Sequence, residues 1–141
     1  MAYQRVYKAF VLASSGTVTD ATVFSELFQN AGYKGCVVVC HRETDAGNAT
    51  MGVRLQGYHR ISDEYYDVAN AELVSYANDA TGVRYAMVYP GATGSDADGS
   101  VLQDTNFSLV NGFLPDEFRI AVTHGGTSIA NTFAVTVEPL N

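Results

Sequence analysis

Two cysteines and a histidine lie close together in the stretch GYKGCVVVCHRET (residues 32–44), and these residue types bind metals or form disulfides. Cys36 and Cys40 are separated only by valines, and His41 follows directly. A run of β-branched residues predicts a strand, on which alternate side chains share one face. Cys36 and Cys40 therefore share a face, about 13 Å apart at about 3.3 Å of rise per residue.

This separation excludes a disulfide between Cys36 and Cys40, because bridged cysteines have Cα atoms within about 7 Å of each other. It also excludes binding of one ion by both thiolates. A zinc site takes about four ligands, usually as paired cysteines across a turn, and the sequence has no second pair. His41 falls on the opposite face with Val37 and Val39. We therefore predict that both cysteines are small hydrophobic residues of the core.

The three histidines, His41, His59 and His124, each stand at the end of an expected strand. We expect their polar tips to reach solvent. Convergence of the three on a metal ion is the alternative, but the cupin pattern of two histidines one residue apart with a glutamate is absent. We expect no metal and no cofactor.

Two acidic segments could bind an ion or take part in catalysis, and each could also be an exposed loop. Asp96 and Asp98 lie in the glycine-rich stretch GATGSDADGS and could bind Ca²⁺, but the further ligands of an EF-hand are missing, which favours a solvated loop. The segment SDEYYD (residues 62–67) could supply a carboxylate for glycoside hydrolysis. We favour an exposed loop that leads into an edge strand.

The motifs of common catalytic sites are missing from the chain. There is no Gly-x-Ser-x-Gly nucleophile elbow and no glycine-rich phosphate loop followed by lysine. We therefore predict no catalytic residues and a protein that is not an enzyme.

Alternation of apolar and polar residues dominates the chain and is interrupted at intervals by turn residues. The segment from residue 21 to 29 fits a helix or a strand, and its β-branched residues favour the strand. Turns or loops are expected at 14–17, 30–35, 44–50, 90–100 and 125–128. Strands are expected at 6–13, 36–42, 51–59, 65–68, 83–89, 117–124 and 130–138, with a further short one within 101–109.

Eight or nine short strands with turns every 8–12 residues or so predict an all-β fold, a single antiparallel β-sandwich of which a jelly roll is one form. We assign residues 1–141 to one domain, with residues 1–5 as an N-terminal arm. The chain is 47% hydrophobic and only 16% charged, which excludes disorder through charge. The apolar stretch Ala9–Ala13 is shorter than the roughly 7–15 residues of a signal-peptide core, so we expect synthesis in a cytoplasm.

The net charge of −7 disfavours direct binding to nucleic acid or to an anionic membrane. The chain has nine tyrosines and no tryptophan. Tyrosine is frequent in strands, but it is also enriched at protein interfaces because it buries much area at a low entropy cost. The candidate interface residues are Tyr3, Tyr58, Tyr65, Tyr66 and Tyr89.

Several landmarks occur in a characteristic order: GYKG (32–35), VRLQGY (53–58), YAMVYPGA (85–92) and the segment LPDEFRIAVTHGGTSIANTFAVTVEPL (114–140). In these features the chain resembles small all-β virion proteins encoded among the head and tail genes of tailed bacteriophages. The resemblance implies a structural role, foremost as a capsid decoration (cement) protein on the virion surface. Its partners would be the major capsid protein or other virion proteins, and copies of itself in a homo-oligomer.

Two alternatives to capsid decoration stay open. One is a tail or neck component of the same kind of virion. The other is a carbohydrate-binding β-sandwich module, which would gather aromatic residues on one exposed face.

Overall fold

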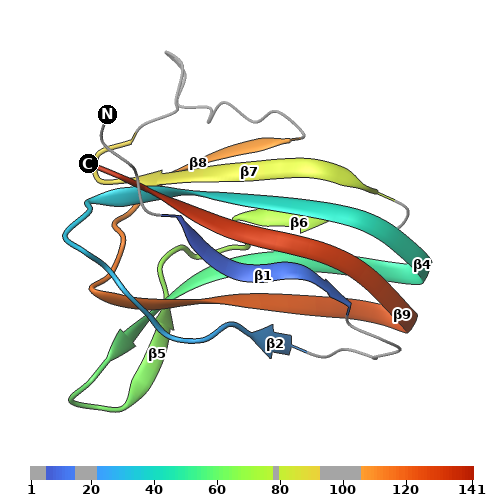
Figure 1. The fold of residues 1–141 in the computed structure, drawn as a ribbon, viewed down its shortest axis with the longest axis horizontal. Helices are drawn as coiled ribbons and strands as arrows, with labels where there is room; N and C mark the ends of the chain where they lie inside the picture. The colour runs from blue at the N-terminus through green and yellow to red at the C-terminus, as the bar shows by residue number, and fades with distance from the viewer. Residues whose placement is uncertain (1–5, 15–21, 78–79, 93–105) are drawn as a thin grey trace.

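The computed structural model describes residues 6–14, 22–77, 80–92 and 106–141, and within them the chain is all-β without a helix (Figure 1). The predicted fold class is confirmed. The nine strands are β1 (Tyr7–Ser14), β2 (Thr22–Phe24), β3 (Phe28–Gln29), β4 (Gly35–His59), β5 (Glu64–Asp67), β6 (Val74–Tyr76), β7 (Gly82–Tyr89), β8 (Phe107–Asn111) and β9 (Glu117–Leu140).

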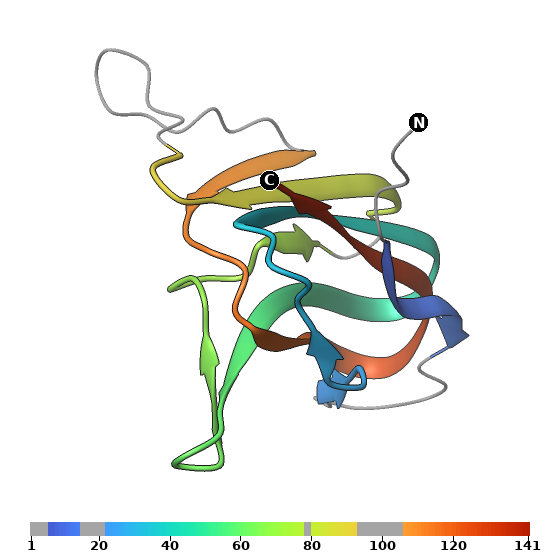
Figure 2. The same ribbon diagram turned by 60° about the vertical axis from the view of Figure 1, so that its left-hand side comes forward.

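Two long strands build both layers of the sandwich. β4 and β9 pair antiparallel from Gly35 opposite Leu140 to Gly57 opposite Phe118, and they turn together from one layer into the other (Figure 2). The first sheet has the order β1-β9-β4-β7-β8, and it uses the first half of β4 and the second half of β9. The second sheet uses the other halves, with β2 and β3 beside β9, and β5 and β6 beside β4.

The turns expected at 44–50 and 125–128 are absent, and that part of the prediction is wrong. The two segments lie opposite each other and stay paired, from Thr44 opposite Thr132 to Thr50 opposite Gly125. Register shifts fall between Arg42 and Thr44 and between Ala46 and Asn48. Such irregularities bend a strand and increase its twist. The glycines and small polar residues that suggested a hairpin therefore mark the place where a strand pair changes layers.

The core follows the predicted alternation. In the first half of β4, Cys36, Val38 and Cys40 are fully buried, whereas His41 on the other face is exposed. In β9, Phe118, Ile120 and Val122 point inward from the second sheet and Phe133, Val135 and Val137 from the first. Burial of these side chains between the sheets is the main stabilising contribution. One pair departs from the antiparallel pattern, since β8 runs parallel to β7.

A tyrosine and an arginine close the core at the edge formed by β6 and β7. The Tyr76 hydroxyl oxygen lies 2.9 Å from the carbonyl oxygen of Cys40 and 2.8 Å from that of Gly82, so a residue of the second sheet is tied to two strands of the first. Arg42 is fully buried and donates from Nη1 to the carbonyl oxygens of Ala77 and Ala80, at 3.0 Å each. These bonds fix Ala77 and Ala80 against β4.

Candidate binding surface

On the outer face of the second sheet, an arginine side chain packs between two aromatic rings. The guanidinium carbon of Arg119 lies 3.8 Å from the ring centroid of Phe24 and 3.3 Å from that of Tyr65. A planar guanidinium has two faces, so the two rings occupy one face each. Tyr58 extends the group, because its ring centroid is 5.0 Å from that of Tyr65. We call Phe24, Tyr58, Tyr65 and Arg119 the Arg119 cluster.

The strand register places all four residues of the Arg119 cluster on the outer face. Phe118 and Ile120 point into the core, so Arg119 between them points outward. Gln56 lies opposite Arg119, and Tyr58 lies opposite Tyr65 on β5. Phe24 reaches Arg119 from β2 on the other side of β9.

A chain of polar contacts holds the Arg119 side chain in place. Its Nε donates to Oε1 of Gln56 at 2.9 Å, and Nε2 of Gln56 donates to Oδ1 of Asp67 at 2.9 Å. The second carboxylate oxygen of Asp67 accepts from Nη1 of Arg54 at 3.1 Å. Positive and negative groups therefore alternate across the face. These contacts fix the conformations of the four side chains in the free chain.

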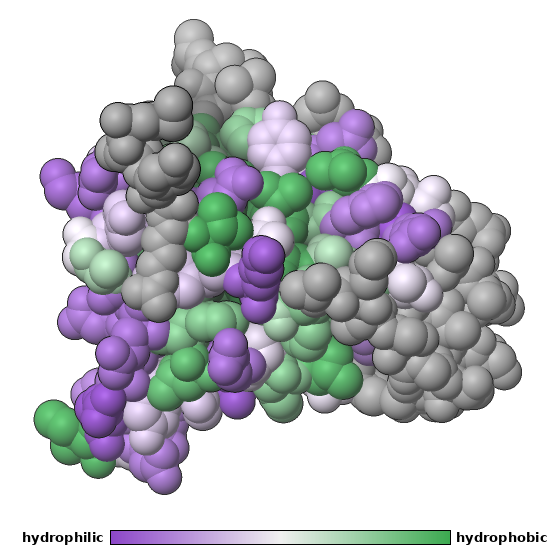
Figure 3. Space-filling view, viewed as in Figure 1, coloured by the Kyte–Doolittle hydropathy of each residue, from purple (hydrophilic) through white to green (hydrophobic). Residues whose placement is uncertain are grey.

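The β4–β5 hairpin extends the same face away from the body of the sandwich (Figure 1). In its turn, Asp63 has a φ of 55° and accepts a hydrogen bond of 2.5 Å from the Tyr58 hydroxyl. This bond to a carboxylate raises the pKa of Tyr58. Ile61 at the tip is 93% exposed, and Figure 3 shows a hydrophobic spot among hydrophilic side chains at that end of the molecule. Arg60 is tied back to the sheet by an ion pair with Glu117.

The predicted interface tyrosines are distributed over the molecule. Tyr58 and Tyr65 meet in the Arg119 cluster. Tyr66 is 40% exposed, and its ring lies where a side chain at Gly57 would otherwise stand. Tyr89 lies on the first sheet, and its hydroxyl donates to the carbonyl oxygen of Asn141 at 2.9 Å. Tyr3 lies outside the described residues.

Both cysteines are free and buried, as predicted. Burial raises the pKa of Cys36 to about 12, and it raises the pKa of Cys40 to about 12 as well. Such thiols are poor nucleophiles at neutral pH because the thiolate is the reactive form. The two residues therefore belong to the core.

The prediction that all three histidine tips reach solvent is wrong for His124. His41 and His59 are exposed, but His124 is fully buried beside Phe133, with ring centroids 5.4 Å apart. Its pKa is lowered, first by burial and second by the positive charge of Arg42. Within the described residues, no three His, Cys, Asp or Glu side chains are grouped closely enough to hold a metal ion.

Of the two acidic segments, the structure describes only SDEYYD. SDEYYD forms the exposed end of a hairpin turn and the edge strand β5, as predicted. Asp96 and Asp98 lie outside the described residues, and so does the expected arm at residues 1–5.

Sequence reasoning did not find Arg119 or Phe24. The alternation of β9 carried a signal for Arg119, because it is the charged residue between two inward-pointing apolar ones. Nothing local connects it with Phe24 and Tyr65, since the three residues come from strands far apart in the chain.

Comparison of the chain with known protein families, curated proteins and solved structures found no match. The described part of the chain contains no helix of the length and apolar character needed to cross a bilayer.

Proposed function

We propose that this chain is a non-enzymatic structural protein of a tailed-phage virion, a capsid decoration protein that docks on the major capsid protein through the Arg119 cluster. The cluster carries the proposal. It presents Tyr, Phe and Arg side chains together, and these residue types supply much of the binding energy at protein interfaces. Since Gln56 and the two rings already hold Arg119, little side-chain freedom is lost on binding.

The resemblance in sequence landmarks points to the virion, and the physics of the chain is compatible with it. A decoration protein binds a shell in many copies, so each contact can be modest because repetition on a lattice raises the effective concentration. A net charge of −7 suits the outside of a particle better than its DNA-filled interior. A tail or neck component would use the same surface on a different virion protein.

Carbohydrate binding is the second candidate, and one observation favours it. Three aromatic side chains lie on one exposed sheet face near polar groups of Gln56 and Asp67, as in a sugar-binding platform. Against it, the Arg119 guanidinium already covers one face of both Phe24 and Tyr65. A sugar stacks on a free ring face, whereas a protein partner can contact ring edges and the guanidinium. We therefore favour a protein partner.

Co-sedimentation with procapsids of the virus that encodes the chain tests the proposal. We expect wild-type protein to sediment with the particles and Tyr65→Ala to bind about 30-fold more weakly or worse, the loss of a hot-spot residue. Tyr85→Ala is the matched control, because Tyr85 is similarly exposed on the outer face of the first sheet and stacks on Phe107.

Equal binding by Tyr65→Ala and wild type would contradict the assignment of the surface. Saturable binding on a glycan array, lost in Tyr65→Ala, would replace the proposal with carbohydrate binding. Thermal unfolding of both variants by circular dichroism checks that each is folded.

A further inference from the structure

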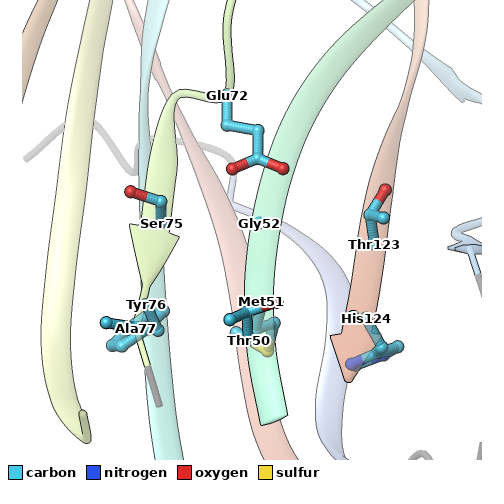
Figure 4. Close-up of a pocket in the computed structure, with 10 residues that line it drawn as sticks. Thr50, Met51, Gly52, Glu72, Ser75, Tyr76, Ala77, Thr123 and His124 are labelled. Atoms are coloured by element: carbon cyan, nitrogen blue, oxygen red, sulfur yellow. The ribbon is translucent and has the colours of Figure 1, made fainter. Parts of the chain in front are cut away.

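The edge strands of the second sheet are built so that they pair poorly with another chain. An open strand edge is a template for further strands, and proteins protect it with short strands, charged residues or register shifts. β2, β3 and β6 have three, two and three residues. β5 has Glu64 and Asp67 at its two ends. Figure 4 shows β6 beside β4, with the Glu72 carboxylate over β4 at Gly52, so an acidic side chain also stands where β6 begins.

The two edges of the first sheet differ from each other. At one edge, β1 has the exposed Lys8 and two register shifts against β9. At the other edge, β8 has the sequence FSLVN without a charged residue, and it pairs with β7 without a register shift. No described strand pairs with the other side of β8. Among the described strands, β8 is therefore the edge that none of these features protects.

The main-chain groups of alternate residues in β8 point away from β7. The Tyr85 amide donates to the carbonyl oxygen of Asn106 at 2.9 Å, and the Gly112 amide donates to that of Tyr89 at 3.3 Å. Each residue of a strand directs its N–H and its C=O to the same side, and this side alternates along the strand. The even-numbered residues from 106 to 112 therefore face β7. The residues that direct their N–H and C=O groups to the open side are Phe107, Leu109 and Asn111.

We propose that a second copy of this chain pairs with β8 and continues the first sheet through a two-fold dimer. The two β8 strands run antiparallel, with Leu109 opposite Leu109 of the other copy. In this register, Phe107 lies opposite Asn111 of the other copy. All the residues whose main-chain groups face the open side then form hydrogen-bonded pairs, each of which exchanges both N–H···O bonds.

Charge and symmetry favour a second copy as the occupant of the β8 edge. Each copy has a net charge of −7, so two copies repel each other in most orientations. β8 has no charged residue, so no like charges stand opposite each other in the pair. An unrelated strand would need a matching length and register, whereas a two-fold pair of identical strands has both by symmetry.

The geometry of the pair also determines where the Arg119 clusters lie. Two antiparallel strands of one sheet are related by a two-fold axis perpendicular to the sheet, so both copies keep the same face on the same side. The Arg119 clusters of the two copies therefore point in the same direction, and the dimer presents two docking surfaces to one shell. The inference goes beyond the proposed function, because the pairing itself needs no capsid.

Sedimentation velocity of the purified chain over a series of concentrations tests the pairing. A single pair of short strands is smaller than a standard interface, so we expect a reversible dimer with a dissociation constant on the order of 10–100 µM. The variant Leu109→Lys places two positive charges opposite each other and should raise the dissociation constant about tenfold or more.

Val83→Lys is the matched control, because it makes the same change in net charge on β7 rather than on β8. Val83 is 53% exposed, so a lysine at this position reaches solvent. This variant should dimerise as the wild type does. Thermal unfolding followed by circular dichroism checks that both variants are folded.

Hydrogen exchange of the wild-type chain, followed by NMR, gives a second measurement that needs no variant. The amides of Leu109 and Asn111 should exchange more slowly as the protein concentration rises, because they donate only in the dimer. The amides of Ser108 and Val110 face β7 and should exchange at a rate that does not depend on concentration.

Three results would overturn the assignment. The first is a monomer at all concentrations, and the second is equal dimerisation of Leu109→Lys and wild type. The third is slow exchange of Leu109 and Asn111 at every concentration, which would assign the edge to another segment of the same chain. These experiments use the purified chain alone, so their failure is distinguishable from failure of procapsid binding.

Discussion

Replacement of Tyr76 by phenylalanine removes one buried hydroxyl group and leaves the ring in place. Tyr76 is 1% exposed, and its hydroxyl oxygen lies within hydrogen-bond distance of the carbonyl oxygens of Cys40 and Gly82. The bond joins the two sheets at the edge where β6 faces β7. The ring also lies 4.6 Å from the guanidinium carbon of Arg84, a contact that phenylalanine can keep.

The cost follows from the loss of one buried hydrogen bond and from a carbonyl group left without that donor. Together these predict a loss of about 1–3 kcal/mol in the free energy of unfolding. For a chain of this length, that corresponds to a fall in Tm of about 3–10 °C. Urea unfolding followed by circular dichroism measures the free energy, and a thermal scan measures Tm.

Tyr85→Phe is the control, because Tyr85 is 41% exposed on the outer face of the first sheet. It should change the free energy of unfolding by no more than about 0.5 kcal/mol, as expected for an exposed site. Equal stability of Tyr76→Phe and Tyr85→Phe would refute the inter-sheet bond and its role at this edge of the sandwich.

Two further predictions concern buried titratable groups. Cys36 and Cys40, whose pKa values burial raises to about 12, should resist a thiol reagent at pH 8 in the folded protein and react fully in urea; rapid labelling of the folded chain would contradict their place in the core. The pKa of His124 is lowered in the folded protein, so the unfolded chain binds the proton first as the pH falls. The contribution of His124 to the free energy of unfolding should therefore be fully present above about pH 6.5 and decrease as the pH falls below that value. Urea midpoints at pH 8 and pH 5.5 should therefore differ more in the wild type than in His124→Gln, and an equal difference in both would show that another group is responsible.

The sequence contained enough information to predict the fold class and the faces of the central strands. Alternation assigned Cys36, Val38 and Cys40 to one face because the side-chain period of a strand is two. The same rule extends to His124, which has the parity of Phe118, Ile120 and Val122, and its burial was missed because residue type was given more weight than register. Arg42 shares the parity of the two cysteines and is buried with them, so the same rule applies to it.

The continuous strands β4 and β9 and the Arg119 cluster both depend on strand pairings that local sequence does not encode. Residues 44–50 contain glycine, asparagine and aspartate, which are typical of a hairpin, and only the pairing with residues 125–132 of β9 keeps them extended. The Arg119 cluster draws residues from β2, β4, β5 and β9. Its existence follows from the order of the strands in the second sheet.

Hydrogen exchange on the particle-bound protein tests the central claim most directly. If the outer face of the second sheet docks on the capsid, backbone amides in β5, in the second half of β4 and in residues 117–123 of β9 exchange more slowly on procapsids than in the free protein, while amides of β7 exchange at the same rate in both. Protection confined to β7 and β8, or none in either sheet, would contradict the account.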